Sequence, residues 1–260
     1  MNEVPADLAG RPEGPVELPA LVVAAARGPL EAVWRNGLGG LTFRDGDRFL
    51  KWMPEGVGIP LRDEAVRLEW AGRFHPVPHV LAVESDASGE LLVTAALPGR
   101  SAVDERVRAD PAAAAAAIGA GLRALHEALP VAECPFDWSP AERGWALPHP
   151  SIDRLVVCHG DACAPNTLIG DDGRWRGHVD LGGLGVADRW ADLAVASMSL
   201  DWNFGAGHEG ALFAAYGIEP DAERLDFYRM LWNREDAAAP ANAEGEPPGP
   251  GGGAPGRLRG

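Results

Sequence analysis

The stretch that decides the fold is HGDACAPN at residues 159–166, followed by DLG at residues 180–182. A short apolar run, Leu155–Cys158, comes directly before it and predicts a buried strand that ends where the polar residues begin. Asp161 and Asn166, five positions apart, are then expected on the loop that leaves this strand. The spacing predicts a loop built to present a carboxylate and an amide at one place.

A hairpin is predicted between the two motifs. The runs Thr167–Ile169 and His178–Leu181 lie on either side of the turn residues 171–173. Such a hairpin returns the chain to its starting end, so Asp180 is expected beside Asp161.

The three side chains suit phosphoryl transfer. Transfer from ATP requires a carboxylate that accepts the proton of the acceptor hydroxyl, and an amide and a second carboxylate that hold Mg²⁺. Asp161, Asn166 and Asp180 have the order of kinase catalytic and metal loops, with Gly160 in place of the usual Arg and Leu181 in place of Phe. The alternative is that Asp161 and Asn166 cap turns, as these residues often do. The complete spaced set favours Asp161 as catalytic base and Asn166 and Asp180 as metal ligands.

Lysine usage indicates a phosphate contact. Of 23 basic residues, Lys51 alone is a lysine and the other 22 are arginines. A compact ammonium suits phosphate oxygens in a tight cleft better than a planar guanidinium does. Lys51 lies in a predicted strand, and Glu64 on the following helix is its expected partner, with Asp63 and Glu69 as nearby competitors.

Two further segments are candidates for nucleotide contacts. The glycine-rich turn that begins with Asn36 and Gly37 is expected to cover the phosphates with its backbone N–H groups. Thr94 and Ala96 follow an apolar strand and stand where a hinge would contact adenine through its backbone. Glycine-rich turns also simply join strands, so the first assignment is the weaker of the two.

The order of elements predicts an α+β chain with two lobes and a cleft between them. Residues 1–97 are assigned to a β-rich lobe, with strands expected at 31–34, 41–44, 48–53, 79–84 and 91–95 and a helix at 61–74. Residues 98–236 are assigned to a mainly helical lobe, with helices at 110–126, 190–200 and 208–216. Residues 237–260, rich in Pro, Gly and Ala, are expected to form a disordered tail.

Composition limits the classes of binding partner that are expected for this protein. A net charge of −15 argues against nucleic acid and favours a cationic small molecule, although the charge could also serve solubility alone. Three cysteines do not make a disulfide framework, and there is no signal peptide or long apolar run, so a cytoplasmic protein without membrane contact is expected. A zinc site at Cys158, His159 and Cys163 is set aside because its spacing matches no usual pattern.

Several stretches resemble the aminoglycoside phosphotransferases, in particular the 3′-phosphotransferase-like branch. They are WRNGLGGLTF (34–43), FLKW (49–52), EAVRLEW (64–70), LLVTAALPG (91–99), CPFDWS (134–139), VVCHGDACAPN (156–166) and HVDLGGLGVADRWADLA (178–194). The resemblance implies a protein-kinase-like fold and ATP-dependent, Mg²⁺-dependent O-phosphorylation of an aminoglycoside antibiotic, which confers resistance. It gives the candidate residues named above the same roles.

The chain also departs from the family's pattern on the acceptor side. The segment between Cys134 and His159 is short, Gly183 stands where the family often has Arg, and the chain continues beyond Trp232. Asp201 and Glu209 remain candidates for binding a cation, although both are more simply explained as solvated carboxylates on a helix. Two alternatives therefore stay open: a kinase for another amine-bearing acceptor, and a nucleotide-binding protein without transfer activity. A monomer or weak dimer is expected.

Overall fold

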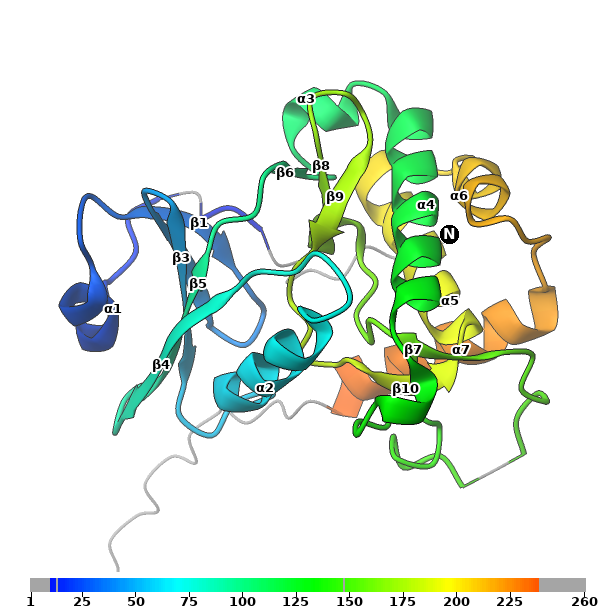
Figure 1. Ribbon diagram of the computed structural model, residues 1–260, viewed down its shortest axis with the longest axis horizontal. Coiled ribbons are helices and arrows are strands. Elements are labelled where there is room, and N and C mark those ends of the chain that lie inside the picture. The colour runs from blue at the N-terminus through cyan, green and yellow to red at the C-terminus, as the bar shows by residue number, and fades with distance from the viewer. Residues whose placement is uncertain (1–9, 13, 147, 239–260) are drawn as a thin grey trace, which may run out of the picture.

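The amino-terminal half forms an antiparallel sheet of five strands. The computed structural model describes residues 10–12, 14–146 and 148–238. The strands are β1 (Glu31–Arg35), β2 (Leu41–Asp45), β3 (Arg48–Pro54), β4 (Val80–Asp86) and β5 (Gly89–Ala95), in the spatial order β1-β2-β3-β5-β4 (Figure 1). All five predicted strands are present, with ends shifted by one or two residues.

Helices cover both faces of this sheet. Leu50 on β3 packs with Val22 of α1 (Ala20–Ala25), whereas Met53 packs with Leu68 of α2 (Leu61–Ala71). Because side chains alternate along a strand, Lys51 has the parity of Met53 and points to the α2 side. Alternation on β3 thus directs Lys51 toward the helix that carries Glu64.

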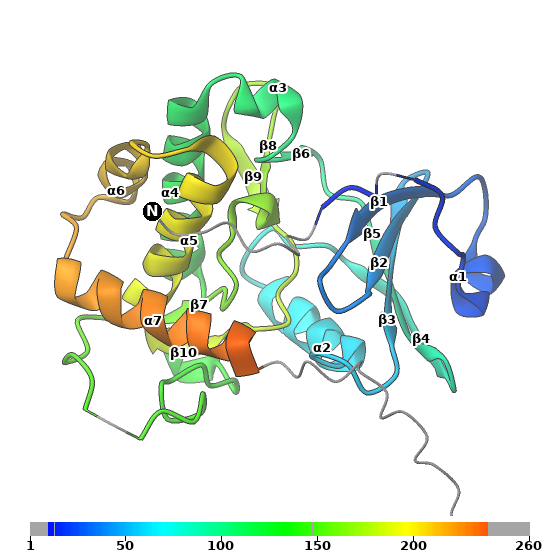
Figure 2. The same cartoon turned by 180° about the vertical axis from the view of Figure 1, so that it is seen from behind.

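The carboxy-terminal half is built around α4 (Pro111–Ala128). Its N-cap is Asp110, whose carboxylate accepts the backbone N–H of Ala113, and Pro111 occupies the first turn. The other helices are α3 (Glu105–Arg108), α5 (Trp190–Phe204), α6 (Glu209–Tyr216) and α7 (Ala222–Ala238), and Figure 2 shows α4 to α7 together on the side away from the five-stranded sheet. Helix α6 lies so close to α4 that a Cβ at Gly119 would be 2.2 Å from the Leu212 carbonyl oxygen.

Two small sheets frame the motif loops. Strand β7 (Leu155–Cys158) pairs antiparallel with β10 (Gly185–Asp188), and β8 (Thr167–Ile169) lies between β6 (Arg100–Ser101) and β9 (Trp175–His178). The hairpin is present, but its second strand ends at His178 where the sequence predicted it to begin. Asp180 has φ of 63°, a left-handed conformation that a strand cannot contain. The metal-loop motif is therefore a loop from Val179 onward.

The remaining differences between the predicted and the observed elements lie toward the carboxyl end of the chain. Helix α7 was not predicted, and its last two residues, 237 and 238, fall in the segment assigned to a tail; residues 239–260 lie outside the described residues. The described part of 134–154 contains no helix, as expected from its prolines. None of the helices described is long and apolar enough to cross a membrane.

Candidate active site

Lys51 lies between two carboxylates from separate parts of the chain. Its Nζ is 2.7 Å from Glu64 Oε2 on α2 and 2.6 Å from Asp180 Oδ1 on the metal loop. Glu64 is 5% exposed, which makes its ion pair with Lys51 a buried one. Helix α2 carries three acidic residues, Asp63, Glu64 and Glu69, and the structure places Glu64 against Lys51.

The electrostatics of this cluster follow from burial and charge. Burial disfavours the Lys51 ammonium, but the charges of Asp180 and Glu64 outweigh it and raise the pKa of Lys51. Burial raises the pKa of Glu64, and the Lys51 charge offsets this rise in part. For Asp180, burial is outweighed by the Lys51 charge, and its pKa is lowered. Lys51 is therefore charged and Asp180 ionised near neutral pH.

Asp161 and Asn166 are joined across the loop of residues 159–166, the candidate catalytic loop. The Asn166 side-chain amide donates to the Asp161 backbone oxygen at 3.0 Å and to Asp161 Oδ2 at 3.2 Å. Asp161 Oδ1 is buried and accepts no hydrogen bond from the described residues. Burial first, and the Asp180 charge second, raise the pKa of Asp161. A carboxylate whose pKa is raised in this way is suited to accept a proton from a bound hydroxyl.

The ligand chemistry around Asn166 and Asp180 fits a hard cation. Because the Asn166 Nδ2 group donates back to Asp161, its Oδ1 is left as an acceptor. Asp180 adds an ionised carboxylate of which Oδ1 contacts Lys51. Amide and carboxylate oxygens are the ligands that Mg²⁺ takes in nucleotide sites.

Two glycines let the catalytic loop and the metal loop touch. Gly160 has φ of 84°, and a Cβ there would be 1.9 Å from the Gly183 carbonyl oxygen. No side chain can be accommodated at this contact without moving one of the two loops. The glycine at 160, where kinases usually have Arg, is thus required by the approach of the loops.

Most N–H groups of the glycine-rich turn already donate hydrogen bonds within the turn. Asn36 Oδ1 accepts the N–H groups of Leu38 and Gly40, and the N–H groups of Asn36 and Gly39 also donate within the turn. Gly37 thus keeps the N–H of this turn that has no acceptor among the described residues. Internal closure by the Asn36 side chain, an Asx-type turn, is the physical reason. A phosphate contact by Asn36 and Gly37 stays a prediction.

Thr94 and Ala96, the hinge candidates, already use some of their backbone groups in hydrogen bonds within the protein. Thr94 lies within β5, opposite Phe49 of β3 and Val80 of β4. The Ala96 N–H donates to the Asp47 oxygen at 2.8 Å, which leaves its carbonyl as the group that could meet a base. The adenine role of Thr94 and Ala96 stays a prediction.

The two candidates for binding a cationic acceptor, Glu209 and Asp201, differ in whether they already have an ion-pair partner. Glu209 Oε1 is 2.5 Å from Arg229 Nη2, so its charge is already neutralised within the protein. A cationic substrate would have to compete with Arg229 for Glu209, and a contact by Glu209 stays a prediction. Asp201, on α5, is exposed and remains a candidate.

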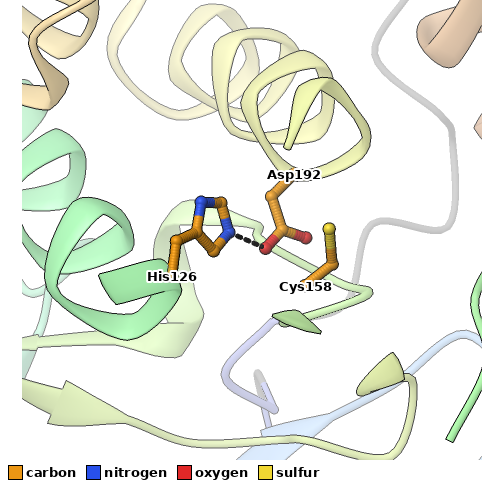
Figure 3. Close-up of side chains that lie close together, drawn as sticks. All are labelled: His126, Cys158 and Asp192. Atoms are coloured by element: carbon orange, nitrogen blue, oxygen red, sulfur yellow. Dashed lines mark hydrogen bonds and ion pairs between the residues drawn. The ribbon is translucent and has the colours of Figure 1, made fainter. Parts of the chain in front are cut away.

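The structure adds Asp192 and His126, which sequence reasoning missed (Figure 3). Asp192 is 1% exposed on α5, and its carboxylate accepts the backbone N–H groups of His159 at 2.6 Å and Gly160 at 3.0 Å. His126 Nε2 on α4 is 2.9 Å from the same carboxylate. The available signal was an aspartate among the apolar residues 190–196 at the start of α5, because a buried carboxylate requires partners.

Cys158 lies beside these two side chains in Figure 3, and the three ligand atoms are within 4.8 Å of one another. Burial raises the pKa of the Cys158 thiol well above its usual value, so it stays protonated. The Asp192 oxygens already face N–H donors, which would repel a cation. The cluster is therefore a hydrogen-bonded support for the loop and not a metal site.

The fold and the site together define a two-lobed phosphotransferase of the kinase type. Comparison with known proteins agrees: residues 42–150 and 141–228 match the phosphotransferase enzyme family. The chain is 36% identical to an aminoglycoside 3′-phosphotransferase of Streptomyces fradiae over 219 residues, 68% of this chain and 81% of that protein. It is 34% identical to a streptomycin 3″-kinase of Streptomyces griseus over 250 residues, 77% of this chain and 90% of that protein.

Solved structures give the same result. An aminoglycoside 3′-phosphotransferase of type VIII aligns with a TM-score of 0.67 and 30% identity, covering 82% of this chain and 96% of that one. A Streptomyces rimosus aminoglycoside phosphotransferase, solved with ADP and streptomycin, aligns with a TM-score of 0.63 and 28% identity, covering 81% and 94%. This chain belongs to the phosphotransferase enzyme family. The predicted family, α+β kinase-like fold and enzyme class are confirmed.

Proposed function

We propose that this protein transfers the γ-phosphate of ATP to a hydroxyl group of an aminoglycoside antibiotic and thereby confers resistance. The observation that carries the proposal is the cluster of Lys51, Glu64 and Asp180 beside Asp161, whose Oδ1 accepts no hydrogen bond from the described residues. The relatives that the chain matches over most of its length, an aminoglycoside 3′-phosphotransferase and a streptomycin kinase, support this acceptor class.

Each group has a defined task in this proposal. Lys51 contacts the phosphates and is oriented by Glu64. Asp161 Oδ1 accepts the hydrogen bond of the acceptor hydroxyl and receives its proton as the hydroxyl oxygen attacks the γ-phosphorus, while the bond from the γ-phosphorus to the β–γ bridging oxygen breaks and ADP leaves. Asn166 and Asp180 would hold Mg²⁺, which supplies neutralisation of phosphate charge when bound.

Net charge and exposed carboxylates suit a polycationic acceptor. The charge of −15 raises the local concentration of cations near the protein surface. Asp201 offers an exposed carboxylate on α5, the helix that contacts the catalytic loop through Ser199, whose Oγ accepts the Ala164 N–H at 2.8 Å. The same charge supports a function without nucleic acid, and the free thiols support a cytoplasmic location, with the protein as a monomer or weak dimer.

The test is acceptor-dependent ADP release with Mg-ATP, using streptomycin and a 3′-hydroxylated aminoglycoside such as kanamycin, with Asp161→Asn as the inactive control. Release that requires both an aminoglycoside and Asp161 is the expected result. If ATP binds but neither drug increases release, the aminoglycoside proposal fails. Turnover of choline or another amine-bearing alcohol would then identify a different acceptor, and no turnover at all would indicate a nucleotide-binding protein.

A further inference from the structure

A chain of buried hydrogen bonds connects α6 to the catalytic loop. The Tyr216 hydroxyl, on α6, is 2.8 Å from His126 Nδ1 on α4. His126 Nε2 is 2.9 Å from Asp192 Oδ2 on α5, and Asp192 accepts the backbone N–H groups of His159 and Gly160. Tyr216, His126 and Asp192 are 5%, 4% and 1% exposed, so water does not compete for these bonds.

The direction of each hydrogen bond is fixed by chemistry. Burial opposes ionisation of Asp192, but the hydrogen bond from His126 outweighs it and lowers the pKa of Asp192, so its carboxylate accepts. His126 Nε2 must therefore carry a proton, and in the neutral imidazole this leaves Nδ1 as an acceptor. Burial raises the pKa of Tyr216 to about 12, so its hydroxyl stays protonated and donates to Nδ1. The Tyr216 hydroxyl, the His126 imidazole and the Asp192 carboxylate then each have a hydrogen-bond partner.

This series of hydrogen bonds ends at His159, which contacts the segments that carry Asp161 and Asp180. His159 lies between the loops: its Nε2 is 3.0 Å from the Val179 carbonyl oxygen, and its Nδ1 accepts the Asp161 N–H at 3.3 Å. Val179 directly precedes Asp180. A shift of the His159 backbone would thus move the catalytic carboxylate and the metal-loop carboxylate together.

We propose that Tyr216 is a positioning residue for phosphoryl transfer, acting through His126 and Asp192 on the catalytic loop. Its hydroxyl holds the imidazole in the tautomer that donates to Asp192, and Asp192 holds the loop that presents Asp161. The proposal rests on the proposed transferase function for its kinetic test, because positioning is measured as turnover.

The variant is Tyr216→Phe, which removes one hydroxyl and keeps the ring. The control is Tyr228→Phe: Tyr228 is the other tyrosine of the sequence, 2% exposed, and its hydroxyl has no hydrogen-bond partner among the described residues. We expect Tyr216→Phe to lower kcat about tenfold with little change in KM for ATP or acceptor. Tyr228→Phe should keep the wild-type kcat when both variants are assayed below their melting temperatures.

Amide hydrogen exchange gives a second measurement that needs no turnover. In Tyr216→Phe, the His159 and Gly160 amides should exchange about tenfold faster than in wild type, and in Tyr228→Phe at the wild-type rate. His126→Gln, which keeps a donor toward Asp192, should retain more activity than His126→Leu. Equal kcat in the two tyrosine variants, or unchanged exchange at His159 and Gly160, would overturn the proposal. Absence of acceptor-dependent turnover in the wild type would refute the transferase instead, and exchange alone would then decide the role of Tyr216.

Discussion

Replacing Lys51 by Met should destabilise the protein in a way that depends on pH. The change removes the ammonium that neutralises Glu64, a carboxylate that is 5% exposed on α2. Because a buried, unpaired carboxylate is costly, Glu64 in the variant will take up a proton. The native variant then binds a proton that the unfolded chain does not bind near neutral pH. Its stability must therefore rise as the pH falls.

The size of the effect follows from the cost of that proton. Protonating a carboxyl group of ordinary pKa near 4.3 costs about 3.7 kcal/mol at pH 7 and about 1.6 kcal/mol at pH 5.5. The Lys51–Asp180 pair adds at most about 1 kcal/mol, because the Asp180 side chain is 44% exposed and screened by water. Lys51→Met should thus lower the free energy of unfolding by about 4 kcal/mol at pH 7 and clearly less at pH 5.5.

Urea unfolding of the wild type, Lys51→Met and the double variant Lys51→Met/Glu64→Gln at both pH values measures this. The neutral amide needs no proton, so the double variant should recover most of the loss at pH 7 and show little of the variant's extra pH dependence. Equal destabilisation by Lys51→Met at pH 5.5 and 7, or no recovery with Gln at position 64, would refute the proposed electrostatics.

Three other substitutions, one of them with a matched control, have distinct expected outcomes. Asp161→Asn should reduce kcat by about a thousandfold, with the ATP dissociation constant from calorimetry nearly unchanged, and a parallel loss of ATP binding would contradict its role as the base. Gly160→Ala should lower both Tm and kcat because its Cβ would meet the Gly183 carbonyl oxygen. Gly173→Ala, at φ of 74° with open space around it, should cost only about 1 kcal/mol of backbone strain and keep kcat, so similar kinetics for the two would argue against the loop contact. Burial holds the pKa of His75 at about 4, and His75→Gln should therefore flatten the loss of stability that unfolding titrations show as pH falls from about 6.5 toward 4, by up to about 1.4 kcal/mol per pH unit; an unaltered slope would exclude His75 as its source.

Much of the fold could be predicted because its elements have a clear period or clear ends. The five strands have alternating or continuous apolar residues, and α4 has an Asp–Pro start followed by alanines. The second hairpin strand was placed too late because Trp175–His178 contains Arg and Gly and lacks an apolar pattern. Helix α7 was missed because charged residues interrupt its apolar positions, and only packing against α5 selects them.

The chemical groups of the site could also be predicted, whereas their supports could not. Residue type and spacing were enough to select Lys51, Asp161 and Asp180 as candidates, since phosphoryl transfer requires these groups in this order, and the structure brings Lys51 and Asp180 together. The hydrogen bonds of Asp192 with His126 and the catalytic loop join three separate elements, and no local pattern encodes such contacts. The ion pair of Glu209 could not be predicted for the same reason, because its partner Arg229 lies on another helix.

The single lysine of this chain gives chemists one amine beside the proposed phosphate site. Lys51 is the only side-chain amine in the sequence, and 22% of its side chain is exposed. Activated esters and aldehydes react with the neutral amine, and the charges of Asp180 and Glu64 keep Lys51 protonated, so these reagents should modify the amino terminus first and Lys51 only slowly. Attachment to a solid support through amines should therefore leave Lys51 unmodified in most molecules. An ATP analogue that carries an aldehyde near its phosphates could form a single, identifiable adduct.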